Sequence, residues 1–319
     1  SNTKKFENIP NGSRTIVKTI FEDSQKRIWL GYFEKGMSYY NPATKQFKHF
    51  GHNPGLATSI GANNVWSITE DKAGTIWAGI LGGGVAQLTD AQNGIFKRYN
   101  YDASNPSSIS SNDVIVIFAD KKDRLWVGTD TKGLNLLDKT TGKCIRIQHK
   151  KDDPNSLSAN EIRCIFEDSK GRLWIGTEGG GLNLWLGKDK FQRFTEKDGL
   201  LSNSVVSIIE DAKGFLWVST YKGLCRMAMK NNQFLNFHFG ENSYFKANQF
   251  NQAAAYSSTS KGILFWGGIN GLTVINPDNV KTFLKPPNVV FTDFKIFNQS
   301  VGTGILADGR KLFDRSLEQ

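Results

Sequence analysis

The sequence predicts an all-β fold, a β-propeller of four-stranded blades, because one pattern recurs six times along its 319 residues. The clearest copy runs from Phe166 to Trp185 and contains an acidic pair, a glycine turn, a tryptophan and a run of glycines. Each copy holds up to four short segments with the apolar patterning of strands, and no amphipathic helix is evident. Four short strands in roughly 40 to 50 residues are typical of a propeller blade.

A turn aspartate followed six residues later by tryptophan sets the period. These aspartates are Asp23, Asp71, Asp120, Asp168 and Asp211, and the sixth copy has Phe265 in the tryptophan place. One large aromatic side chain at a fixed place in each blade would fill the wedge between neighbouring sheets, and each buries on the order of 150–250 Å². We therefore expect this ring of aromatic residues to be core, not a ligand stack.

Within one repeat, the first strand alternates at Ile162, Cys164 and Phe166, as expected for a strand with one buried face. An Asp and Gly hairpin turn leads to the tryptophan strand, and a second glycine turn leads to the third strand. The fourth strand has an apolar-x-x-apolar pattern such as Phe191–Phe194. The fifth copy has this pattern at Phe234–Phe237.

The sixth repeat ends near Pro277 without a fourth strand, whereas Phe6–Ile9 at the N-terminus has the fourth-strand pattern and no blade of its own. Pairing the two would close a six-bladed ring and remove two free edges; a fragment of a seven-bladed ring is the alternative. We expect the propeller to cover residues 1–280. The period then stops, and Val289–Phe297 in residues 281–319 predicts a new strand without the blade landmarks, the truncated beginning of a second domain.

Composition excludes several classes of protein. The net charge is +10, but the lysines are scattered, which argues against direct nucleic-acid binding. No run of 18 apolar residues is present, so this stretch predicts no membrane span. The three cysteines and four histidines show no metal spacing, and the glycine runs lack the Lys-Ser/Thr of a phosphate loop. We expect buried free thiols, no metal and no cofactor.

The repeated Glu-Asp-x-x-Gly-x-Leu-Trp-x-Gly-Thr with a following Gly-Gly-Gly-Leu, clearest at residues 167–182, resembles the two-component regulator propeller repeat. Residues 249–277 resemble the last blade of that family, and Pro286–Asn298 is similar to the start of its triple-tyrosine sandwich domain. The copies at Asp23 and Asp120 depart from the pattern because they lack the turn glycine.

This resemblance implies the periplasmic sensor region of a membrane-bound hybrid histidine kinase that senses glycan-derived oligosaccharides. It further implies a homodimeric receptor, attached to the membrane through parts outside this sequence, in which this chain is not itself an enzyme. Two alternatives remain open: a propeller enzyme, a lyase or hydrolase, and a protein–protein interaction scaffold.

Repetition separates scaffold from site. The acidic pairs and the asparagines eight residues before each turn aspartate (Asn63, Asn112, Asn160 and Asn203) recur in most repeats, so we expect structural roles and loop capping.

Function should lie in loops that do not repeat. In this strand order the turns after the second strand and the connectors between blades open on one face, where aromatic and polar side chains suit a saccharide, neutral or anionic. The ligand-binding candidates are Tyr32, Lys35, Trp66, Arg163, Glu178, Tyr221, Lys222, Asn248 and Asn270, accompanied by Phe33, Glu34, Asn64 and Gln249.

Overall fold

The computed structural model describes residues 15–227, 249–258, 261–269, 271–280, 295–296 and 299–300. The chain divides into two compact units, Ser1–Asn279 and Val280–Gln319. In the second unit the structure describes one short antiparallel pair, Lys295–Ile296 (β23) with Gln299–Ser300 (β24). Most of the predicted sandwich strand Val289–Phe297 lies outside the described residues, so its assignment stays a prediction.

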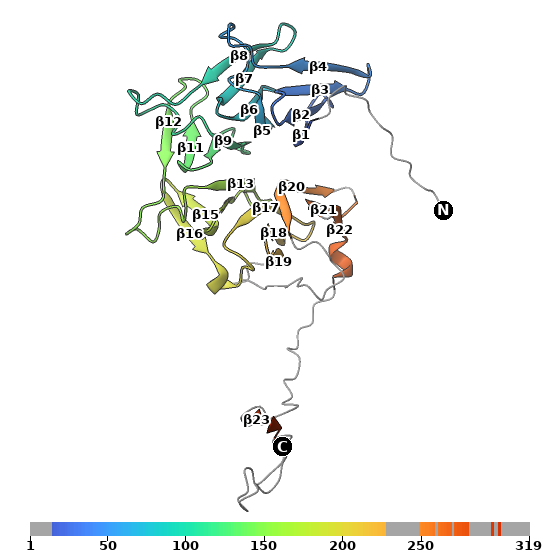
Figure 1. Cartoon of the computed structure of the whole chain (residues 1–319), viewed down its shortest axis with the longest axis vertical. Helices are drawn as coiled ribbons and strands as arrows, with labels where there is room; N and C mark the ends of the chain where they lie inside the picture. The colour runs from blue at the N-terminus through green and yellow to red at the C-terminus, as the bar shows by residue number, and fades with distance from the viewer. Residues whose placement is uncertain are drawn as a thin grey trace, which may run out of the picture. The chain divides into compact units, whose positions relative to one another are not determined.

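The first unit is a propeller of six antiparallel sheets, which we call blades 1 to 6 (Figure 1). Blade 1 comprises β1 (Val17–Glu22), β2 (Ile28–Tyr32), β3 (Met37–Asn41) and β4 (Gln46–Phe50). Blade 2 comprises β5 (Asn64–Glu70), β6 (Ile76–Leu81), β7 (Gly84–Asp90) and β8 (Ile95–Tyr99). Blade 3 comprises β9 (Val114–Ala119), β10 (Leu125–Thr129), β11 (Leu134–Leu137) and β12 (Cys144–Ile147).

The second half of the ring follows the same order. Blade 4 comprises β13 (Ile162–Glu167), β14 (Leu173–Thr177), β15 (Gly181–Gly187) and β16 (Lys190–Phe194). Blade 5 has β17 (Val205–Glu210), β18 (Leu216–Thr220) and β19 (Gly223–Met227), and blade 6 has β20 (Phe250–Ser258), β21 (Ile263–Gly268) and β22 (Gly271–Ile275). The predicted fourth strands of blades 5 and 6, Phe234–Phe237 and Phe6–Ile9, lie outside the described residues.

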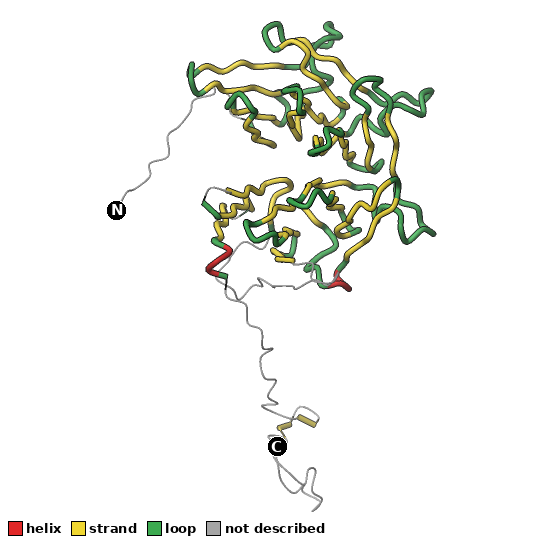
Figure 2. Tube along the Cα trace, turned by 180° about the vertical axis from the view of Figure 1, so that it is seen from behind, coloured by secondary structure: helices red, strands yellow, loops and turns green. Residues whose placement is uncertain are grey.

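The first strand of each blade lies toward the centre of the ring, and in blades 1 to 4 the fourth strand lies outermost (Figure 1). The described residues contain only two helical turns, Glu196–Asp198 (η1) and Pro277–Asn279 (η2), against a background of strands and loops (Figure 2). The all-β propeller class predicted from the repeat is thereby confirmed.

The turn aspartate is the hub of each blade, as blade 4 shows. Oδ1 of the buried Asp168 accepts hydrogen bonds from the backbone N–H groups of Lys170 and Arg172 at 3.0 and 2.9 Å. Oδ2 accepts from Trp174 Nε1 at 2.9 Å and Arg172 Nε at 2.6 Å. In blades 1, 2, 3 and 5, the equivalent tryptophan also donates a hydrogen bond to the turn aspartate of its own blade. These acids are thus scaffold, as predicted.

The two hairpin turns that lack glycine have a strained backbone. Gly171 has φ +73°, and Lys26 and Asp123 take φ +64° and +65° at the same turn position in blades 1 and 3. Residues other than glycine enter this left-handed region at a cost, so these two hairpins keep their shape against local preference.

The repeated asparagines bind the loops between blades. Asn160 Oδ1 accepts from the His149 N–H at 2.8 Å, and the Asn160 carbonyl accepts from the Gly133 N–H at 2.9 Å. The side chains of Asn63, Asn112 and Asn203 accept a backbone N–H in the same way. The predicted loop-capping role is confirmed.

Neighbouring blades are also joined by a carboxylate before the hub. Glu210 of blade 5 accepts from the N–H and Oγ of Ser169 in blade 4 at 2.7 and 2.8 Å. Glu70 and Glu167 accept from the preceding blade likewise. Glu22, their counterpart in blade 1, instead accepts from Lys26 of its own turn at 2.8 Å.

The junction of blades 1 and 6, which we call the seam, differs from the other junctions. Ile20 in blade 1 is 69% exposed, whereas its equivalents Ile68, Ile117, Ile165 and Ile208 are 4–8% exposed. Tyr256 and Leu272 of blade 6 are also exposed. A cleft of about 560 Å³ separates the two blades and is lined by residues of both.

Candidate functional site

A β-bulge marks the beginning of the innermost strand in every blade. The pairing of β13 with β14 passes from Ile162 to Cys164, so Arg163 has no register partner. The residues skipped in the same way in blades 1, 2, 3 and 5 are Lys18, Trp66, Ile115 and Val206. In blade 6 the skipped segment is longer, residues 251–254. Bulges redirect side chains and are enriched near functional sites.

The bulge position repeats in geometry but not in chemistry. It holds a lysine, a tryptophan, an isoleucine, an arginine and a valine in blades 1 to 5. Ile115 and Val206 are buried, whereas Lys18 and Trp66 line a cavity of about 450 Å³. The other lining residues of this axial cavity are Ile16, Val17, Tyr221 and the segment Phe250–Ala254. Its volume falls within the range of small-molecule sites.

Beside the axial cavity, Arg163 joins two hairpin turns. Its Nη1 lies 2.6 Å from Asp130 Oδ1 in the β10–β11 turn, and its Nε lies 3.1 Å from Glu178 Oε2 in the β14–β15 turn. Ser204 Oγ donates to Glu178 Oε1 at 2.9 Å. Gln252, which lines the cavity, donates from Nε2 to the Arg163 carbonyl at 3.0 Å. The arginine therefore ties blades 3, 4 and 6 together at the cavity.

Charge and burial shift the pKa values of two groups here. Burial lowers the pKa of Arg163, but the hydrogen bonds and charges of Asp130 and Glu178 outweigh this effect and leave the pKa raised. Burial raises the pKa of Tyr221, and the Glu178 carboxylate adds to the rise while Arg163 opposes it. Both side chains thus keep their protons, so Arg163 is a fixed cation and Tyr221 a neutral hydroxyl near neutral pH.

Lys18 of blade 1 and Trp66 of blade 2 also line the cavity. The Lys18 ammonium lies 4.3 Å from the ring centroid of Trp66 and 5.6 Å from that of Phe33. The buried Trp66 Nε1 has no hydrogen-bond partner in the described part of the chain, unlike the hub tryptophans, which donate to aspartates. Trp66 is therefore outside the repeated scaffold.

The structure brings together four of the predicted candidates. Trp66 and Tyr221 line the cavity, and Arg163 and Glu178 are paired beside it. Phe33, of the accompanying set, contacts Lys18. These contacts agree with the expectation that the turns after the second strand and the connectors between blades open on one face. Whether these residues bind a ligand stays a prediction.

Other candidates lie elsewhere. Tyr32 in β2 is only 2% exposed, and its ring centroid lies 6.4 Å from that of His49. It is therefore a core residue. Lys35 is exposed, and Lys222 pairs with Glu196 at 3.3 Å. Asn64 Oδ1 accepts from the Glu34 N–H, a loop contact, and the Gln249 carbonyl accepts from the Ile269 N–H. Asn248 and Asn270 lie outside the described residues.

Sequence reasoning missed Lys18, Asp130, Ser204 and Gln252. A signal was present for Lys18: it precedes its hub aspartate by five residues, as Trp66 and Arg163 precede theirs. Repeats aligned on the aspartates therefore place these three side chains in one structural position.

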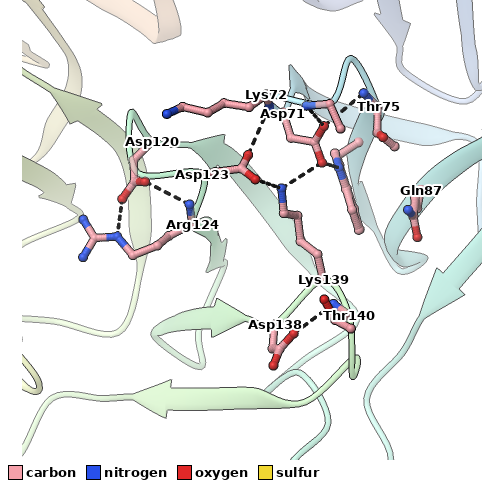
Figure 3. Close-up of polar contacts among 12 residues, drawn as sticks. Asp71, Lys72, Thr75, Gln87, Asp120, Asp123, Arg124, Asp138, Lys139 and Thr140 are labelled. Atoms are coloured by element: carbon pink, nitrogen blue, oxygen red, sulfur yellow. Dashed lines mark hydrogen bonds and ion pairs between the residues drawn. The ribbon is translucent and has the colours of Figure 1, made fainter.

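A second charged cluster connects blades 2 and 3 (Figure 3). Lys139 Nζ lies 3.0 Å from Asp71 Oδ2 and 2.7 Å from Asp123 Oδ2, between the two turns. Arg27, Arg124 and Arg172 pair with the hub aspartates of blades 1, 3 and 4, but blade 2 has Thr75 at that position. Lys139 supplies the missing cation, so this cluster is structural.

The described ranges contain neither a candidate metal cluster nor a helix suited to a bilayer. No group of three or more His, Cys, Asp or Glu side chains there is arranged to hold a metal ion. No helix in those ranges has the length and apolarity needed to span a bilayer.

Fold and site together define a β-propeller with a cavity at one end of its axis. Four segments match the model of the two component regulator propeller: residues 59–82, 108–131, 156–179 and 199–222. They belong to blades 2 to 5. These four repeats therefore match the two component regulator propeller family, as the repeat pattern predicted. No curated protein sequence matches the chain.

Solved structures give the same fold. The extracellular domain of a hybrid two component system of B. thetaiotaomicron is 27% identical with a TM-score of 0.68, over 81% of this chain and 33% of that one. A second such domain from B. thetaiotaomicron is 21% identical with a TM-score of 0.55, over 82% and 42%. This chain thus spans less than half of either domain. Virginiamycin B lyase from Staphylococcus aureus, at 13% identity and TM-score 0.64 over 86% and 85%, shares the fold alone.

Proposed function

We propose that this chain is part of the extracytoplasmic sensor region of a hybrid two-component histidine kinase, and that its axial cavity binds a glycan-derived oligosaccharide. The observation that carries the proposal is a cavity lined by Lys18 and Trp66, two of the bulge residues that differ in chemistry from blade to blade, in a propeller similar to extracellular domains of hybrid two component systems. A rigid repeat whose bulge residue varies is suited to recognising different ligands.

The cavity walls suit a saccharide. Tyr221, about 40% exposed, offers an aromatic face on which a sugar ring can stack. Asn251 and Gln252 offer amide donors and acceptors for hydroxyl groups. Arg163 and Glu178 do not bind ligand directly in this proposal; they hold the two turns that shape the rim.

The proposed location is the periplasm, with the propeller signalling to a kinase across the inner membrane in a homodimeric receptor. Signalling then follows from differential affinity, because a ligand shifts an equilibrium between receptor arrangements only if it binds one of them better. The match of four repeats to the two component regulator propeller model and the similarity to an extracellular domain of a hybrid two component system support this proposal.

Isothermal titration of the purified chain against neutral and acidic oligosaccharides tests the proposal. We expect at least one saccharide to bind, and Tyr221→Ala to weaken that binding by about tenfold through loss of a stacking contact. Tyr101→Ala, which removes another exposed tyrosine on a loop between blades 2 and 3, is the matched control and should bind normally.

Failure of every saccharide to bind, in this chain and in the complete sensor region, would reject glycan sensing. Cleavage of a glycan by the purified chain would support the alternative of a propeller enzyme. Binding that survives in Tyr221→Ala at full strength would place the ligand somewhere other than the axial cavity.

A further inference from the structure

We infer that the axial cavity is selective for an acidic saccharide and that Lys18 binds its carboxylate. This inference rests on the proposed function, because it names the chemical class of ligand for the same cavity. It concerns the side of the cavity formed by blades 1 and 2.

The position of Lys18 is fixed by the fold. It is the bulge residue of β1, and the pairing of Val17 with Tyr32 and of Thr19 with Gly31 holds the backbone on both sides of it. Its ammonium lies over the rings of Trp66 and Phe33. Two aromatic faces attract an ammonium through the negative potential above the ring, yet they accept none of its hydrogen bonds in the ordinary sense. The N–H donors of Lys18 are therefore available to a ligand.

In the described part of the chain, no acidic side chain balances the charge of Lys18. No ion pair found among the described residues includes Lys18, whereas the charge of Arg163 is balanced by Asp130 and Glu178. The described residues that line the cavity include no Asp or Glu. A partly enclosed site with one unbalanced cation favours an anionic ligand over a neutral one.

The other residues that line the cavity indicate which kind of molecule carries the carboxylate. Tyr221 and the Asn251–Gln252 amides line the same cavity as Lys18, and they suit a sugar ring and its hydroxyls. A cavity of about 450 Å³ accommodates a monosaccharide or a disaccharide end. A sugar with a carboxylate, a uronic acid, supplies the ring, the hydroxyls and the anion in one ligand. Trp66 acts in this arrangement as a positioning residue for the lysine.

Paired saccharides test this inference. The whole chain is titrated with oligosaccharides of galacturonic and glucuronic acid, and with the same oligosaccharides after reduction of each carboxylate to a neutral alcohol. We expect an acidic member to bind at least about tenfold more tightly than its reduced partner, since a charged hydrogen bond is worth roughly that factor or more. Added salt should weaken the binding of the acidic oligosaccharide and leave the binding of a neutral one unchanged.

Lys18→Gln and Lys143→Gln form the matched pair of variants. Lys143 is an exposed lysine of the β11–β12 loop, outside the axial cavity. We expect Lys18→Gln to lose the tenfold preference for the acid while its melting temperature stays near that of the parent chain. Lys143→Gln should keep both.

The outcomes separate the two proposals. If reduced saccharides bind as tightly as acidic ones, or if Lys18→Gln keeps the preference, the carboxylate site is wrong and saccharide sensing stands. If no saccharide of either kind binds, this inference fails together with the proposed function.

Discussion

At the scale of the residue, identical side chains have different roles because one position repeats and the other does not. Trp174 is fully buried and donates to Asp168, as its equivalents do in other blades. Trp66 stands at the variable bulge and holds a lysine ammonium instead. The same contrast separates Glu210, which joins two blades, from Glu178, which pairs with Arg163 at the cavity.

The three cysteines give a residue-scale prediction. Burial raises the pKa of the Cys144 and Cys164 thiols to about 12 and that of Cys225 to about 11. The thiolate is the reactive form, so native protein at pH 8 should react with iodoacetamide far more slowly than unfolded protein. Mass spectrometry counts the labelled thiols; rapid labelling of any one in the native state would contradict its burial.

The same shifts predict a loss of stability in alkali. A thiol whose pKa is higher in the folded state than its ordinary value of 9.0 favours folding below pH 9. That contribution decreases as the pH rises from about 9 towards 12. Chemical denaturation at pH 8 and pH 10.5 should show a steeper loss for the parent chain than for a Cys164→Ala variant.

At the scale of the element, the hub aspartate controls the hairpin of its blade. Although burial raises the pKa of Asp168, hydrogen bonds from Trp174 and the Arg172 backbone and side chain leave it below its ordinary value. We expect Asp168→Asn to destabilise the fold by about 2–4 kcal/mol, because the partly exposed Arg172 and the buried Trp174 indole both lose the charge of a fully buried acceptor. Urea denaturation measures this loss.

The sign of the pH dependence follows from the depressed pKa. The stabilising contribution of Asp168 is complete above its ordinary value of 3.8 and decreases as the pH falls through the lower folded-state pKa. Asp168→Asn should therefore lose less stability between pH 5 and pH 3 than the parent chain. Asp152→Asn, at an exposed aspartate in a loop, should match the parent in both respects.

We expect the loss of Lys139 to destabilise the junction between the turns of blades 2 and 3. Burial lowers the pKa of Lys139, but the hydrogen bonds with Asp123 and Asp71 outweigh it and leave the pKa raised. Lys139→Met removes the cation from two carboxylates, one of them buried, and should cost about 2 kcal/mol. Lys143→Met in the same loop should be neutral. A melting temperature equal to the parent's would show that Lys139 contributes nothing.

How far the sequence could predict the structure differs between the elements and the site. Hydrophobic period and turn residues identified the blades, the hubs and the capping asparagines, because these depend on local pattern. The bulge at Arg163 could not be predicted, because it depends on hydrogen-bond register between two strands. Asp130 was missed because it gains its role from a neighbouring blade. In blade 6, Phe265 keeps the hub register, but the fully buried ring is that of Trp266.

At the scale of the whole molecule, the seam and the axial cavity form one continuous region. The residues Val17, Lys18, Ala253 and Ala254 line both the cavity and the seam cleft. Lys18 therefore belongs to the blade at which the ring is least tightly packed, and a ligand bound there would contact both sides of the seam.

The seam makes its own prediction through a matched pair of substitutions. Ile20 and Ile165 both lie three residues before a hub aspartate on an innermost strand, but Ile20 is 69% exposed and Ile165 is 8% exposed. Ile165→Thr should cost about 2–3 kcal/mol, because it places a hydroxyl in a packed interface between blades. Ile20→Thr should change the free energy of unfolding by no more than about 0.5 kcal/mol. Equal losses in the two variants, measured by urea denaturation of the same chain, would show that blade 1 is covered in solution as the other blades are.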